Sequence, residues 1–162
     1  MADFLEEIER FLASFSPEEV AVMRHAFRAI LEGRPARVAE LQAGVGFPPA
    51  VVDEAIQRLS ERGVFVVEPD TGEITGARGI SLAETSHRLL LDGTLRYAFC
   101  AVDAVGVPVA LRATATIESH CRHCRAPLTL KLKDGVVVEA PPGGMVIWAI
   151  ERDLGRSLRA HT

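Results

Sequence analysis

The chain has 162 residues, of which 48% are hydrophobic and 25% are charged, and its formal net charge is −4. This composition is typical of a folded globular protein and excludes a disordered or collagen-like chain. No run of about 18 apolar residues occurs and no basic segment near Met1 leads into an apolar run, so we expect a cytoplasmic protein without a membrane partner.

The first eighty residues carry apolar side chains at helical spacing. Ser16, Pro17 and Glu19 form the pattern of a helix start, in which Ser16 caps the helix and Glu19 reaches back to it. Gly33 is suited to end that helix. The pattern as a whole predicts helices over 4–12, 17–32, 38–43 and 49–62.

A short hairpin is predicted next, with strands over 64–67 and 73–75. Together with the two preceding helices it resembles a winged helix, which would raise the question of DNA binding. The candidate recognition helix, however, carries Asp53, Glu54 and Glu61 against only Arg58 and Arg62. Phosphate contacts need an excess of cations, so the sequence argues against a nucleic-acid partner.

After Gly79 the pattern changes to short strands, predicted over 87–91, 112–118, 127–133, 136–139 and 146–150. An apolar stretch over 95–104 is predicted to be helical. We therefore expect an α+β protein with two domains: a helical, winged-helix-like domain over 1–80, packed on a small, mostly antiparallel β-rich domain over 81–162.

The three cysteines all lie between positions 100 and 124, which favours free thiols at a site over a disulfide framework. Cys100 and Asp103 are three residues apart, so in a helix they would share a face. A thiol can bind a soft metal once it loses its proton, and a neighbouring carboxyl can accept that proton and return it to a leaving group. A buried cysteine beside a helix-terminal aspartate is the simpler interpretation of this pair.

Cys121 and Cys124 form a C-x-x-C pair in a predicted turn, flanked by His120 and His123. Such a turn lets two sulfur atoms face one metal ion, but a closed zinc site needs four ligands. We therefore consider Cys100, Cys121, Cys124, His120 and His123 as candidate ligands of a bound mercury, zinc or copper ion.

Several segments are similar to the organomercurial (alkylmercury) lyase family. The most specific is the segment 97–103, which contains Cys100 and Asp103; others are 33–35, 82–86, 112–115, 119–121 and 142–145. The resemblance covers most of the chain and implies protonolysis of a carbon–mercury bond, with no cofactor required. It also implies that Cys100 captures mercury, that Asp103 carries the proton and that Cys121 is structural.

The chain resembles a short form of that family. The family's second catalytic cysteine follows the 142–145 loop, and this sequence has no cysteine after Cys124. Cys124 is therefore the candidate for the second catalytic thiol. The expected partner is an organomercurial or a soft metal ion, and a shortened sheet with an exposed edge predicts a homodimer.

Two alternatives to a lyase-like function stay open at this point. The first is a non-catalytic protein that binds zinc, copper or mercury through its thiols, because binding requires only converging sulfur atoms. The second is a metal-responsive winged-helix regulator.

Overall fold

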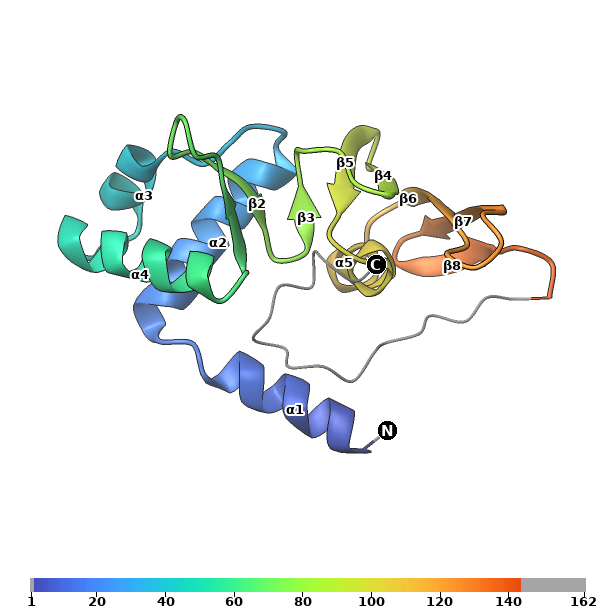
Figure 1. Ribbon diagram of the computed structural model, residues 1–162, viewed down its shortest axis with the longest axis horizontal. Helices are drawn as coiled ribbons and strands as arrows, with labels where there is room; N and C mark the ends of the chain where they lie inside the picture. Colours follow the sequence, from blue (N-terminus) through green and yellow to red (C-terminus); the bar gives the residue numbers. More distant parts are fainter. Residues whose placement is uncertain (1, 144–162) are drawn as a thin grey trace.

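The computed structural model describes residues 2–143, without the side chains of residues 2–5, 7 and 8 (Figure 1). The expected strand over 146–150 lies outside the described residues. The N-terminal part contains the helices α1 (Ala2–Ala13), α2 (Pro17–Leu31), α3 (Val38–Gly44) and α4 (Pro49–Glu61). The rest contains the helix α5 (Ala101–Leu111) and eight strands: β1 (Phe65–Val67), β2 (Ile74–Ala77), β3 (Ile80–Ser81), β4 (His87–Leu91), β5 (Thr94–Ala98), β6 (Ala115–His120), β7 (Pro127–Lys133) and β8 (Val136–Glu139).

The start of α2 follows the predicted pattern. Ser16 is the N-cap, its hydroxyl accepts a hydrogen bond from the backbone N–H of Glu19, and the Glu19 carboxylate accepts one from the backbone N–H of Ser16. Both bonds satisfy N–H groups that a helix start leaves without partners, so local sequence alone defines this boundary.

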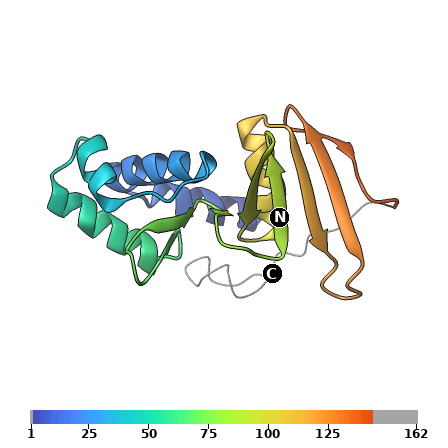
Figure 2. The same ribbon diagram turned by 90° about the horizontal axis from the view of Figure 1, so that it is seen from above.

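The eight strands form one antiparallel sheet in the order β1-β2-β3-β5-β4-β6-β7-β8. In the view from above, α2, α3 and α4 lie toward the β1–β2 end, and α5 lies against one face of the middle strands (Figure 2). The α+β class is thereby confirmed. The sheet runs without a break past residue 80, and the expected division into two domains there stays a prediction, as does the winged-helix assignment.

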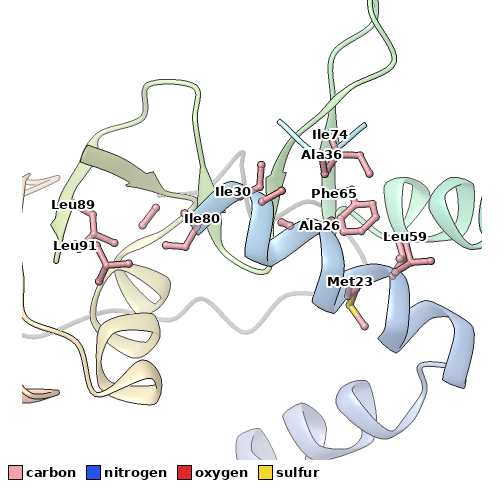
Figure 3. Packing of buried hydrophobic residues seen from close by; sticks show 14 of the residues in the cluster. Met23, Ala26, Ile30, Ala36, Leu59, Phe65, Ile74, Ile80, Leu89 and Leu91 are labelled. Atoms are coloured by element: carbon pink, nitrogen blue, oxygen red, sulfur yellow. The ribbon is translucent and has the colours of Figure 1, made fainter. Parts of the chain in front are cut away.

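The core is continuous between the two parts of the chain. Met23, Ala26 and Ile30 of α2 are buried, and Figure 3 shows them between Leu59 and Phe65 on one side and Ile80 on the other. Leu89 and Leu91 continue the same cluster beside α5. Burial of these side chains joins the helices to the sheet and fixes the position of α5.

One buried cation reinforces this junction. Arg96 of β5 is only 3% exposed, and its guanidinium donates to the carbonyl oxygen atoms of Ile30 at 2.6 Å and of Leu31. These carbonyls belong to the last turn of α2, where a helix leaves acceptors without partners and a cation is favoured. Arg96 therefore connects the end of α2 to the sheet.

The predicted helix over 95–104 is wrong in its first part, and only 101–104 is helical. Thr94–Ala98 forms β5, and the helix α5 begins only at Ala101. The turn at Asp92 and Gly93, both with positive φ, returns the chain from β4 to β5 and so places this apolar stretch in the sheet. The strand predicted from residue 112 begins later, at Ala115, because Arg112 ends α5 in the left-handed conformation.

Among the described strands, β8 lies at one edge of the sheet, and Val136 and Val138 on it are 64% and 62% exposed. The expected homodimer stays a prediction. None of the helices in the described residues is long and apolar enough to cross a membrane.

Candidate active site

Cys100 and Asp103 meet at the start of α5. Cys100 is the N-cap, with extended backbone angles (φ −149°, ψ 171°), and its sulfur accepts a hydrogen bond from the backbone N–H of Asp103 at 3.4 Å. The thiol in turn donates to Oδ2 of Asp103 at 2.9 Å. The first of these bonds is that of a helix N-cap in which a thiol takes the place of the usual hydroxyl. The helix start therefore holds the two reactive groups together.

The environment of this pair keeps the thiol protonated. Cys100 is 4% exposed, and burial, followed by the negative charge of Asp103, raises the pKa of the thiol to about 12. Burial also raises the pKa of the Asp103 carboxyl. A thiol that keeps its proton beside a carboxyl that binds a proton more readily than usual is arranged for transfer of that proton between them.

Gly79 makes room for Asp103. It follows β2, has a φ of +86°, and its carbonyl oxygen accepts a hydrogen bond from the backbone N–H of Phe99 at 2.8 Å. A β-carbon built on Gly79 would lie 2.5 Å from Cγ of Asp103, which real atoms do not tolerate. Sequence reasoning did not identify Gly79 as a site residue, because the contact joins segments that are far apart in the chain.

Asp103 also lines a cavity of about 490 Å³ between the N-terminal helices and α5. Most of the wall is apolar, and two arginines add charge; the lining residues are Phe11, Leu12, Phe15, Val20, Met23, Arg62, Gly63, Val64, Arg78, Gly79, Phe99 and Asp103. The volume is in the range of small-molecule sites, and an apolar wall with one carboxyl suits an organic group that is to receive a proton.

The other predicted site residues lie at the hairpin between β6 and β7. His120 ends β6, Cys121 is half-buried, and His123 and Cys124 are exposed. In the part of the chain that the structure describes, no three His, Cys, Asp or Glu side chains converge as metal ligands would. The expected gathering of Cys100, Cys121, Cys124, His120 and His123 around one ion is therefore not seen in residues 2–143. The role of Cys124 as a second catalytic thiol stays a prediction.

His87 is a buried polar residue that the sequence did not single out. It is 7% exposed, its Nδ1 is 2.9 Å from the hydroxyl of Ser119, and its Nε2 is buried without a hydrogen-bond partner in the described residues. Burial lowers the pKa of His87 and so favours the neutral ring.

The site thus defines a class of protein: an α+β fold with a buried thiol–carboxylate pair beside an apolar cavity, suited to a soft electrophile and a proton transfer. The family model for alkylmercury lyase matches residues 80–162, half of the chain and the part that contains Cys100 and Asp103. The chain therefore belongs to the alkylmercury lyase family.

Curated relatives agree with this assignment. An alkylmercury lyase of Staphylococcus epidermidis is 29% identical over 151 residues, which cover 91% of this chain and 68% of the relative. Alkylmercury lyases of Bacillus cereus and Streptomyces lividans are 26% and 27% identical, over 85% and 84% of this chain. The chain spans only 62% and 61% of the length of these last two.

A solved structure matches as well. The mercury-bound form of MerB2 superposes with a TM-score of 0.86 at 27% sequence identity, covering 94% of this chain and 73% of that chain. This similarity extends over the helical N-terminal part as well as the sheet. The family favours a lyase-like function over the metal-responsive regulator and the non-catalytic metal-binding protein.

Proposed function

We propose that the chain binds an organomercurial through Cys100 and cleaves its carbon–mercury bond by protonolysis, with Asp103 as the proton carrier. The observation that carries this proposal is the 2.9 Å hydrogen bond from the Cys100 thiol to Asp103, where Asp103 borders an apolar cavity. Family membership supports it, because relatives of similar sequence are named alkylmercury lyases.

The first step is capture of the metal. Mercury in a compound R–Hg–X is a soft ion that prefers sulfur, so the Cys100 sulfur bonds to mercury as its proton passes to the adjacent carboxylate of Asp103. The existing hydrogen bond provides the path for this proton. Burial favours neutral forms here, so a neutral Asp103 carboxyl is better tolerated than a carboxylate, consistent with its raised pKa.

The second step breaks the carbon–mercury bond. The electron pair of that bond stays with carbon, which takes the proton from Asp103 and leaves as R–H. In sum, the Cys100 thiol and R–Hg–X give R–H and a Cys100–S–Hg–X adduct, and the Asp103 carboxylate is restored. No oxidant, reductant or cofactor enters this balance, because the thiol supplies the proton and the carboxyl carries it.

The anion X that arrives with the organomercurial keeps the second position on mercury in this scheme. In residues 2–143, no third ligand-type side chain joins Cys100 and Asp103 to form a three-residue metal site. A thiolate from solution serves as X equally well. The apolar cavity beside Asp103 holds the group R and keeps water away from the carbon that is protonated.

The experiment is single-turnover incubation of the reduced protein with phenylmercuric and methylmercuric salts, with benzene or methane measured in the headspace and bound mercury measured in the protein. Wild type should release one hydrocarbon per chain. Cys100→Ser should lose hydrocarbon release and most of the mercury binding at the Cys100 site. Asp103→Asn should keep mercury binding but lose hydrocarbon release. Asp70→Asn, at an exposed turn, is the matched control and should behave as wild type. Release by Asp103→Asn at the wild-type rate would refute the proposed role of the carboxyl.

A further inference from the structure

The turn that carries Cys121 and Cys124 is a closed loop between β6 and β7. The backbone N–H of Cys121 donates to the carbonyl of Ala126, and the N–H of Arg125 donates to the carbonyl of Cys121, both at 2.8 Å. Arg125 has a φ of +60°, which lets the chain reverse directly after Cys124. These bonds hold the two cysteines three residues apart on one short turn, before any metal is bound.

The two thiols of this turn lie together. The backbone of Cys124, the backbone of His123 and the thiol of Cys124 lie beside the Cys121 sulfur and lower the pKa of Cys121. The contact between the thiols allows one ion to reach both sulfur atoms.

These thiols are also accessible, unlike Cys100. Cys121 is half-buried and Cys124 is exposed, whereas Cys100 is 4% exposed. The turn follows β6 and Cys100 follows β5, and β4 separates these two strands in the sheet. The register places the end of β6 and the end of β5 at the same end of the sheet. The turn is thus a second thiol location at the end of the sheet that carries Cys100.

From this geometry we propose that Cys121 and Cys124 form a second site, which chelates one soft metal ion of the mercuric type between two sulfur atoms. The number of ligands selects the ion. Zinc in protein sites takes four ligands, and in the described residues no third His, Cys, Asp or Glu completes a site with this pair. A soft ion that accepts two thiolates needs nothing further.

Binding is a ligand exchange. Two S–H bonds break, two S–Hg bonds form, and two protons pass to the solvent; nothing is oxidised or reduced. The pair binds the ion more tightly than a single thiol does because, once one sulfur has bound, the other is held nearby at a high effective concentration. This raises the affinity by a factor of about 100 or more.

The test uses Cys100→Ser protein, reduced and desalted, so that only the turn thiols remain. Mercuric chloride is titrated by equilibrium dialysis against a competing monothiol, and bound mercury is counted per chain. In a parallel sample with one equivalent of mercury, mass spectrometry after alkylation identifies which cysteines are protected. We expect one ion per chain and joint protection of Cys121 and Cys124. Combining Cys100→Ser with Cys121→Ser or Cys124→Ser should weaken mercury binding by about 100-fold.

Three results would overturn the proposal: equal affinity after loss of either turn cysteine, two ions bound per chain, or displacement of mercury by an equal concentration of zinc. The proposal does not rest on the lyase reaction. Cys100→Ser removes hydrocarbon release under the proposed function and leaves this site intact, so failure of one proposal is distinguished from failure of the other.

Discussion

Gly79 and Asp103 are in such close contact that a β-carbon on Gly79 would lie 2.5 Å from Cγ and 2.8 Å from Cβ of Asp103. The side chain of Asp103 is half-buried, and the absent side chain at position 79 is one reason that it fits at the cavity wall. The position of the proton carrier is therefore determined in part by a residue twenty-four positions earlier in the chain.

Gly79→Ala should impair hydrocarbon release more than it impairs folding. The new methyl group displaces Asp103 from the Cys100 thiol, and a positive φ at alanine adds a backbone cost of about 1–2 kcal/mol. Gly46→Ala is the matched control, because Gly46 also has a positive φ (+78°) but no atom within 4 Å of its would-be β-carbon. Urea unfolding and single-turnover release separate the two effects. Equal loss of release in both variants would show that strain, and not the contact with Asp103, is responsible.

Asp103→Asn should make the Cys100 thiol more reactive toward alkylation. The negative charge of Asp103 is the second largest cause, after burial, of the raised pKa of this thiol, about 12. Removal of the charge lowers the pKa, so the alkylation rate should begin to rise at a lower pH than in wild type. The rate at Cys100, followed by mass spectrometry from pH 7 to 10, measures this shift. An unchanged pH profile would mean that burial alone keeps the thiol protonated.

Two Asp-Gly turns show what local sequence could and could not reveal. Asp134–Gly135 joins β7, in which leucines alternate with polar residues, to β8, and both strands were predicted with the bounds that the structure shows. Asp92–Gly93 has the same signature and the same pair of positive φ angles, as expected for a two-residue hairpin turn. The stretch after it, residues 95–104, lacks a regular alternation of polar and apolar residues, so its pattern does not distinguish strand from helix.

The candidate site, too, could be predicted only in part from the sequence. The spacing of Cys100 and Asp103 was enough to predict that the two side chains meet, since both lie within one turn at a helix start. The cavity could not be predicted, because its wall combines residues from Phe11 to Asp103 that only the assembled fold brings together. For the same reason, the sequence could not show that Cys124 does not join Cys100 and Asp103 in a three-residue metal site within the described residues.

His87 should make the folded protein less stable as the pH falls below about 6.5, the ordinary pKa of histidine. Burial lowers the pKa of His87 in the folded state, so at such pH values the unfolded chain binds a proton that the folded chain does not. The contribution of neutral His87 to the free energy of unfolding is therefore fully present above the unfolded-state pKa, and it decreases as the pH falls from that pKa toward the lower pKa of the folded state. His87→Asn, whose amide can take the place of Nδ1 near Ser119, should show a weaker decrease in urea unfolding between pH 7.5 and 5.

The exposed His25 provides the control for this prediction. His25→Asn should keep the wild-type dependence of stability on pH. If His87→Asn also keeps it, another group is the source of the acid sensitivity.

Arg96→Met should destabilise the protein by about 1–3 kcal/mol, because it leaves the Leu31 carbonyl without its side-chain donor and the Ile30 carbonyl with only backbone N–H donors such as that of Gly33. Arg88→Met is the control: Arg88 also pairs with an acceptor, Glu118, but both side chains are about half exposed. Exposed pairs of this kind contribute less than about 1 kcal/mol. Urea unfolding monitored by circular dichroism gives both values. Similar losses in the two variants would contradict the role of Arg96 at the junction of α2 and the sheet.

Leu12→Ala should weaken binding of an aryl mercurial while leaving the fold and the binding of methylmercury nearly unchanged. Leu12 lines the cavity and is 55% exposed, so its side chain contributes little to the core but faces the space proposed for the organic group. Loss of a partial apolar contact of about 1 kcal/mol corresponds to an affinity about fivefold lower for phenylmercury. Leu111→Ala, also exposed (41%) but outside the cavity wall, should have no such effect. Competition binding with phenylmercuric and methylmercuric salts measures the difference, and an equal change for both compounds would place the organic group outside this cavity.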